Sequence, residues 1–224
     1  MKNKFSLLVM VVSLLISGCR KDPLFTDAGT YTDARDNHVY KSVKIGDQIW
    51  MAENLAYLPS VSPSSAGSDS SLFYYVYDYQ GSSVSLAKAT VNYVTYGVLY
   101  NWEAAKTACP SGWHLPGDED WWILTDYLDK TGMTSGGKMK ETGTGHWLSP
   151  NTGATNESGF SALPGGERSH SGGFNEIGNY GEFWTSLEFD ALSVWIRILF
   201  SDMSVVHPDT YDRSDGFSVR CLRD

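Results

Sequence analysis

The sequence predicts an α+β fold with two helices, a small antiparallel sheet system and a long glycine-rich structured loop. Strand-like alternation occurs at 39–52 and again within 182–222, and two helical stripes lie within 98–130. Residues 132–181 hold 13 of the 22 glycines. The 224 residues suit one domain. The 8 tryptophans and 13 tyrosines exclude a disordered chain.

The first residues predict an export signal and a lipid anchor. Two lysines, a short apolar run, two small residues and a cysteine follow one another as Lys2, Lys4, Phe5–Ile16, Ser17-Gly18 and Cys19. This order is typical of a secretory signal, and the position of the cysteine resembles the bacterial lipobox. We therefore expect residues 1–18 to be a lipoprotein signal peptide, 19–30 a lipidated N-terminus and flexible tether, and 31–224 one domain. The alternative is an ordinary signal peptide in which Cys19 is incidental.

The charge balance bears on the partners. The net charge is −9, whereas a nucleic-acid-binding protein needs a basic face, so no nucleic-acid partner is expected. Anionic lipid would repel such a chain, so we expect its membrane contact to be the lipid on Cys19. The predicted location is the cell envelope, at the outer membrane or cell surface of a Gram-negative bacterium.

The first strands are predicted to form a hairpin. Apolar and polar residues alternate between Val39 and Ala52, and Gly46-Asp47 fits a two-residue turn because glycine adopts a positive φ without strain. Residues 59–71 are rich in proline and serine and are predicted to be a loop. Residues 72–96 are ambiguous, with irregular strand and a long insertion both open.

Two helices are predicted to follow. The first has one helical face formed by Val98, Trp102, Ala105 and Cys109. A proline and a glycine directly after Cys109 end it. The second spans Gly117 to Lys130 and has three carboxylates in its first turn, where they suit the helix dipole. Its core stripe is formed by Trp121, Leu124 and Leu128, with Trp122 beside it.

A long loop and several strands complete the chain. Residues 132–181 have too many glycines for regular helix but contain large apolar side chains, so we predict a structured loop pinned by aromatic residues. Strand-like runs follow at 182–187, 193–200, 203–207 and 216–222. In the last run Phe217, Val219 and Cys221 share one face, because side chains alternate along a strand.

Two of the three cysteines remain once Cys19 is assigned to the lipid. Cys109 and Cys221 both lie on predicted core faces, and the oxidising environment of an exported protein favours a disulfide between them. The bridge would close about 112 residues and contribute roughly 4–5 kcal/mol in the chain-entropy model. The alternative is two buried free thiols.

Five motifs occur in order along the chain. They read IGDQIWMAENL at Ile45–Leu55, YGVLYNW at Tyr96–Trp102, ACPSGWHLP at Ala108–Pro116, GFSALPGG at Gly159–Gly166 and GFSVRC at Gly216–Cys221. Together they resemble the Fibrobacter succinogenes major paralogous domain, a family of exported bacterial lipoproteins, over about residues 26–224. One departure is Glu182–Ser186, where relatives tend to have a glycine and an aromatic pair in place of Glu and Phe.

The resemblance implies a C-type-lectin-like fold related to the formylglycine-generating enzymes. It also implies the Cys109–Cys221 pairing, as a disulfide from a helix to the last strand. The copper-dependent enzymes of that superfamily use a pair of reactive thiols, and the assignments above leave no thiol here. We therefore expect no enzymatic activity of this type.

Candidate ligand-binding residues come from the long loop and its flanks. Flat aromatic rings with polar groups nearby are typical of carbohydrate recognition. The candidates are Trp147, Tyr180, Trp184, Trp195, Arg168, Glu167 and Asn175. Arg168 is the best surface candidate, since a charge on a glycine-rich loop has no packing role to explain it. Trp184 and Trp195 could instead be core residues.

Calcium is the alternative ligand chemistry. Oxygen ligands are available on Asn151, Asn156, Glu157, Glu167, Asn175, Glu176, Asn179, Glu188, Asp209, Asp212 and Asp215. The triplets typical of lectin calcium sites are missing, so we favour a solvated acidic loop, with no metal and no cofactor. The expected function is a lipid-anchored domain that binds a carbohydrate or a protein partner at the cell envelope. A structural or adhesin-like surface component is the alternative, and an enzyme ranks third.

Overall fold

The computed structural model describes residues 25–224, so the predicted signal peptide and Cys19 lie outside the described residues. The predicted tether is wrong at its end, because residues 25–30 belong to β1 (Phe25–Thr32). Gly29 in this strand has a φ of +86° and lies at a β-bulge, where a glycine is favoured. A Cβ on Gly159 would come within 2.8 Å of the Phe25 ring, so the start of the strand packs against the long loop.

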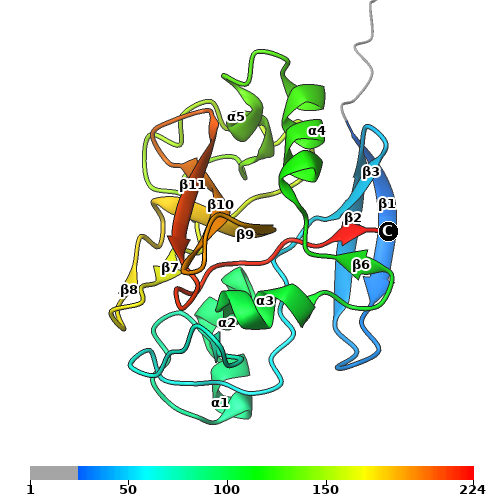
Figure 1. Ribbon diagram of the computed structural model, residues 1–224. Helices are drawn as coiled ribbons and strands as arrows, with labels where there is room; N and C mark the ends of the chain where they lie inside the picture. Colours follow the sequence, from blue (N-terminus) through cyan, green and yellow to red (C-terminus); the bar gives the residue numbers. More distant parts are fainter. Residues whose placement is uncertain (1–24) are drawn as a thin grey trace, which may run out of the picture.

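The largest sheet is antiparallel, with its five strands in the order β1-β2-β3-β12-β6 (Figure 1). Besides β1, this sheet contains β2 (Val39–Ile45), β3 (Gln48–Met51), β12 (Leu222–Arg223) and β6 (Trp113–His114). The predicted hairpin is confirmed, since Ile45 pairs with Gln48 across the two-residue turn. Gly46 there has a φ of +60°, as such a turn requires.

A second antiparallel sheet has the order β11-β10-β9. Its strands are β9 (Tyr180–Glu188), β10 (Ser193–Phe200) and β11 (Val206–Asp212). β10 has the predicted bounds, whereas the strand predicted at 203–207 begins only at Val206. Two small antiparallel pairs join β4 (Tyr74–Tyr75) to β5 (Leu99–Tyr100) and β7 (Glu167–Arg168) to β8 (Phe174–Asn175). The chain is therefore α+β with several small antiparallel sheets.

The helices of the described chain are short. They are α1 (Val84–Lys88), α2 (Val91–Tyr96), α3 (Trp102–Ala108), α4 (Asp118–Leu128) and α5 (Ser135–Met139). The two predicted helices correspond to α3 and α4, although α3 begins late because Asn101 caps it and residues 99–100 pair with β4. The ambiguous segment 72–96 holds α1 and α2. No helix among residues 25–224 is long and apolar enough to cross a bilayer.

The segment 216–222, predicted to be one strand, is a central connection of which only the end is regular strand. Phe217 bridges to Tyr100 and Ser218 to Phe183, and a regular ladder begins only at Leu222. In Figure 1 this red segment passes from the β9–β10 side to the five-stranded sheet. Phe217, Val219 and Cys221 lie in one core cluster, as predicted. The residues between them are buried too, so the segment has core on both sides.

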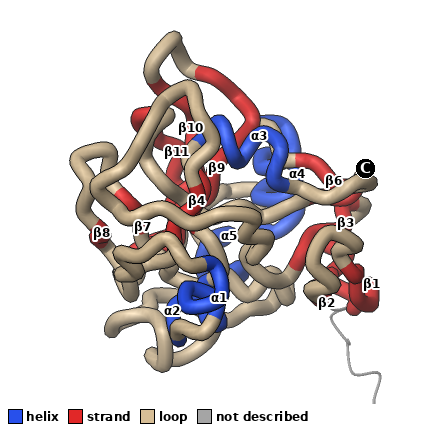
Figure 2. The backbone as a smooth tube through the Cα atoms, turned by 90° about the horizontal axis from the view of Figure 1, so that it is seen from below, coloured by secondary structure: helices blue, strands red, loops and turns tan. Residues whose placement is uncertain are grey.

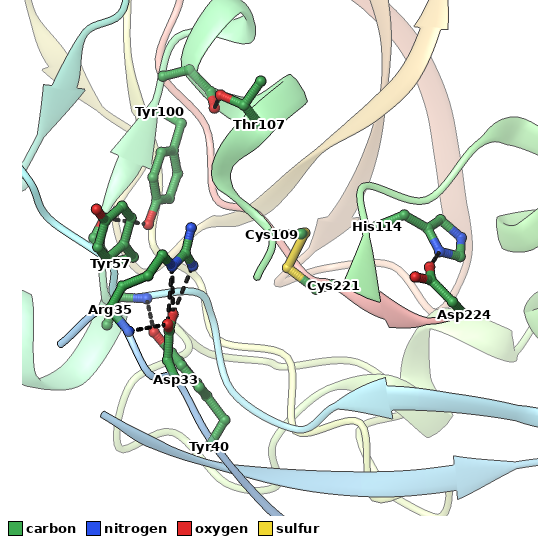
Figure 3. The surroundings of a disulfide bond; sticks show 12 residues. Asp33, Arg35, Tyr40, Tyr57, Tyr100, Thr107, Cys109, His114, Cys221 and Asp224 are labelled. Atoms are coloured by element: carbon green, nitrogen blue, oxygen red, sulfur yellow. Dashed lines mark hydrogen bonds and ion pairs between the residues drawn. A yellow bond between two sulfur atoms is a disulfide. The ribbon is translucent and has the colours of Figure 1, made fainter. Parts of the chain in front are cut away.

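A disulfide joins Cys109 to Cys221, as predicted (Figure 3). It ties the end of α3 to the central segment just before β12. The cluster around it includes Trp102 and Trp184, whereas a second cluster gathers Trp50, Trp121 and Phe160. Aromatic rings therefore dominate both cores.

Loops and turns make up much of the backbone (Figure 2), and the long loop is ordered as predicted. Trp147 and Phe160 are buried and pin it. Two buried cations add to this: Lys140 Nζ donates to the Phe200 and Met203 carbonyls at 2.7 and 2.9 Å, and the Arg220 guanidinium donates to the Phe160 carbonyl. Irregular backbone needs such donors, because its carbonyls lack ladder partners.

Candidate functional site

Arg168, predicted as a surface ligand, is a structural residue. Its side chain is 1% exposed and donates to the carbonyls of Ser64, Ala66 and Ser214 at 2.5–3.0 Å. The guanidinium also lies 4.7 Å from the centre of the Tyr75 ring. The prediction is wrong because neighbouring loops, distant in sequence, supply the packing role that the sequence did not show.

Trp147 and Trp184 are core residues, so the prediction that they bind ligand is wrong as well. Both are at most 1% exposed. The Trp184 indole N–H donates to the Tyr100 carbonyl, and that of Trp147 donates to the Ala162 carbonyl at 2.9 Å. Neither ring has a free face on which a sugar could stack.

Three other predicted residues, Glu167, Asn175 and Tyr180, lie away from Trp195. Asn175 donates to Glu167 at 3.3 Å across the β7–β8 pair. Tyr180 packs edge-on against Phe200, on the face of the β9–β11 sheet opposite to Trp195. Burial raises the pKa of Glu167 above its usual value. The structure therefore separates the predicted candidates, and Trp195 alone of the tryptophans among them stays partly exposed.

The oxygen ligands considered for calcium do not converge. Within residues 25–224, no three His, Cys, Asp or Glu side chains are close enough to hold a metal ion. Several of these side chains make local hydrogen bonds instead. Asp212 accepts from Ser214, for example, and Asn151 donates to the carbonyls of Glu141 and Gly143.

A groove lies where α4 packs against the β9–β11 sheet. We name it the α4 groove, and its volume is about 440 Å³. Its lining residues are Asp118, Trp121, Trp122, Thr125, Leu187, Trp195, Arg197, Val206 and Pro208. In the view of Figure 1, α4 stands above β9, and the two elements are in contact. Trp195 and Arg197 share one face of β10, because side chains alternate along a strand, and both line this groove.

The walls of the α4 groove are aromatic and accessible. Trp122 is 62% exposed on the outer side of α4. Trp195 is partly exposed on β10, and its ring meets the edge of Phe189 at 5.4 Å between ring centres. Trp121 is 1% exposed, and its indole N–H has no acceptor among residues 25–224. The groove thus offers two tryptophan rings to a ligand and holds one unused donor in its wall.

A charged pair crosses the α4 groove. The guanidinium of Arg197 binds the Asp118 carboxylate and also donates to the Ile196 carbonyl at 3.0 Å. The Arg197 side chain is 8% exposed and that of Asp118 is 54% exposed. Burial lowers the pKa of Arg197 to about 10, so the guanidinium remains charged at neutral pH. A guanidinium has five N–H donors, and these two contacts do not use all of them.

Sequence reasoning found Trp195 but missed Trp122, Asp118 and Arg197. The sequence contains one signal for Trp122 and one for Arg197. Trp122 falls beside the core stripe of its helix, which places it toward solvent. Arg197 interrupts an apolar strand and shares the face of Trp195, two residues away. No local signal joins Arg197 to Asp118, because 79 residues separate them.

A second and larger cavity, of about 880 Å³, lies between β1, β2, α2 and the long loop. Its carboxylates are Asp27, Glu53 and Glu141, and each already accepts a hydrogen bond from a neighbour. No tryptophan lines it. The α4 groove is therefore the better candidate for ligand stacking.

The fold is that of an α+β domain in which small antiparallel sheets and a disulfide hold long ordered loops. Comparison with known families gives a specific result: the model of the Fibrobacter succinogenes major domain matches residues 43–223. The chain therefore belongs to this family, as the five motifs indicated. No curated protein matches the chain. No solved structure matches it either.

Proposed function

We propose that the protein is an exported, lipid-anchored domain of the cell envelope that binds a carbohydrate in the α4 groove. The observation that carries this proposal is the pair of solvent-facing tryptophans, Trp122 and Trp195, beside the Asp118–Arg197 pair. Sugar rings stack their C–H faces on such aromatic rings, while fixed polar groups bind the hydroxyls.

The proposed site needs no metal. Asp118 and Arg197 supply charged acceptors and donors directly, and charge-assisted hydrogen bonds are about twice as strong as neutral ones. Thr125 on α4 adds a hydroxyl to the lining. A volume of about 440 Å³ falls in the usual range of small-molecule sites and accommodates a short oligosaccharide segment.

A glycan array tests this function. The full chain with Cys19→Ser, which lacks the attachment point for lipid, is applied with calcium and with a chelator. We expect binding to a defined set of glycans, unchanged by the chelator. Trp122→Ala and Trp195→Ala should each weaken it at least about tenfold, as expected for loss of a stacking ring. Leu86→Ala is the control, because Leu86 is 64% exposed on α1 and does not line the groove.

No glycan binding under either condition would refute the carbohydrate proposal. Binding that survives both tryptophan substitutions would refute the site. Binding lost only with the chelator would show that the recognition depends on calcium, contrary to the proposal.

A protein partner is the second candidate. The turn between β9 and β10 exposes Phe189 by 57% and Leu192 by 63%, and Leu187 beside them is 42% exposed. These side chains extend the apolar surface beyond the groove, as a protein interface would require. A structural or adhesin-like component of the cell surface would use this same apolar area. The Cys109–Cys221 bridge supports our ranking of a thiol-dependent enzyme behind both.

We also propose that the fold is C-type-lectin-like. The disulfide from the end of a helix to the segment before the last strand supports this assignment. The long ordered loop region between α4 and β9 supports it as well. An experimental structure tests the proposal: superposition on lectin-like domains should match the strand order and the disulfide, and a different connectivity would contradict it.

A further inference from the structure

We infer that the α4 groove selects neutral sugars and rejects acidic ones, because Asp118 already neutralises the cation that an acidic sugar would need. This inference rests on the proposed function and goes further by naming the class of ligand. It depends on three observations: the burial of Arg197, the position of Asp118 and the absence of another cation from the groove lining.

The first observation is that Arg197 is held in place. More than nine-tenths of its side chain is buried, and one of its donors is used by the Ile196 carbonyl. Its carboxylate partner Asp118 comes from another element, α4, and is half exposed. The guanidinium is therefore a fixed donor, and the carboxylate keeps acceptor capacity that faces solvent.

The second observation concerns what this pair can bind. A sugar hydroxyl is both a donor and an acceptor. It can donate to Asp118 and accept from Arg197 at the same time, so that adjacent hydroxyls satisfy both members of the pair. A sugar carboxylate has acceptors only, and it would meet Asp118 as a like charge.

The third observation is that no second cation among the described residues of the groove lining compensates for the charge of Asp118. Among the described residues that line the groove, Arg197 is the one cation. Asp118 is the first residue of α4 and is followed by Glu119 and Asp120 in the same turn. The entrance on this side is therefore negative, which disfavours the approach of an acidic ligand.

Isothermal titration on the full chain with Cys19→Ser tests the inference. The probes are neutral oligosaccharides that bind on the array, together with their counterparts that carry a uronic acid or a sialic acid. We expect the neutral member of each pair to bind at least about tenfold more tightly. Asp118→Asn removes the like charge and one charged acceptor, so it should weaken neutral binding about tenfold and remove the preference against acidic ligands.

Glu119→Gln is the matched control. Glu119 lies in the same exposed turn but does not line the groove, so neutral affinity should stay within about twofold. Asparagine keeps an amide oxygen that can accept from Arg197, so Asp118→Asn is expected to fold, and a cooperative melting transition verifies this.

The outcomes separate the two proposals. Tighter binding of the acidic members would overturn the neutral selectivity and leave carbohydrate binding intact. Equal affinities of Asp118→Asn and the unsubstituted chain for neutral sugars would overturn the role of the charged pair. No binding of any sugar would refute the proposed function itself, together with this inference.

Discussion

Three buried cations have a role that is rare for charged residues, that of hydrogen-bond donors to the backbone of loops: Arg168, Lys140 and Arg220. Each is buried, and each donates to backbone carbonyls of irregular segments: Arg168 binds Ser64 and Ala66, for example. A guanidinium has several donors and can satisfy carbonyls from more than one loop at once. These side chains stabilise the long loops where regular hydrogen-bond ladders are missing.

Arg168→Met tests this role. The substitution keeps an apolar stem of similar length but removes every donor, so the buried Ser64 carbonyl and the half-buried Ser214 carbonyl lose the guanidinium, while the Ala66 carbonyl keeps only the Tyr75 hydroxyl. We expect the free energy of unfolding to fall by about 3 kcal/mol, measured by urea denaturation. Arg223→Met, at an exposed position, is the control. A loss of less than about 1 kcal/mol would contradict the structural role.

Glu182 makes stability depend on pH. Its side chain is buried, and neither carboxylate oxygen has a hydrogen-bond partner among residues 25–224. Burial, with smaller contributions from Glu167, Glu176 and Asp215, raises its pKa well above the usual 4.5. The folded state therefore keeps a proton that the unfolded chain releases. Stability from this group is constant below about pH 4.5 and falls as the pH rises from there toward the folded-state pKa.

Glu182→Gln should flatten this dependence, because the amide cannot ionise. Urea denaturation at a series of pH values is expected to show a smaller loss of stability toward alkaline pH than in the unsubstituted chain. Glu157→Gln, at an exposed loop position, should leave the slope unchanged. Parallel slopes for Glu182→Gln and the unsubstituted chain would mean that Glu182 is not the responsible group.

At the scale of elements, the disulfide connects α3 to the segment that precedes β12. It closes a loop of 112 residues, and the cross-link limits the unfolded chain more than the folded one. We expect the double substitution Cys109→Ala, Cys221→Ala to lower the free energy of unfolding by roughly 4 kcal/mol. A thiol assay on the denatured Cys19→Ser chain should detect thiols only after reduction. Two thiols before reduction would refute the bridge.

Some elements could be predicted because their signals are local. The β2–β3 hairpin depends on its two-residue turn, and β10 on an apolar run that Arg197 alone interrupts after Val194. The short helices α1 and α2 depend on caps at Ser83 and Thr90, which a search for long periodic stripes does not detect. Segment 216–222 was predicted to be a strand with one core face, since alternation does not reveal that both of its sides are covered.

The candidate site could be predicted only in part, because local patterns do not show how distant segments pack together. The position of Trp195 can be predicted from the alternation along its strand. The groove, in contrast, exists because α4 packs onto that face of the strand. Arg168 and Trp184 were misplaced because their partners, Ser64 and Tyr100, come from distant segments. Local pattern shows which side chains can bind a ligand, and packing decides which of them remain available.

At the scale of the whole molecule, the proposed anchor and the described domain are close together. Five residues lie between Cys19 and Phe25, where β1 begins, and this stretch of chain can span at most about 22 Å. The proposed anchor predicts that the chain partitions with membranes and incorporates an alkyne-labelled fatty acid. Cys19→Ser should abolish the label and release the protein, whereas Ser17→Ala keeps a small residue before the cysteine and should preserve both. Labelling of Cys19→Ser would refute the anchor.

The central position of segment 216–222 has a consequence for how the protein is made. Its residues complete a core on both sides, and the bridge at Cys221 closes onto α3. Synthesis starts at the N-terminus, so neither core can be completed before this segment has been made. Folding must therefore follow synthesis of nearly the whole chain. On the proposed export route, this delay keeps the polypeptide unfolded while it is threaded through a secretion channel.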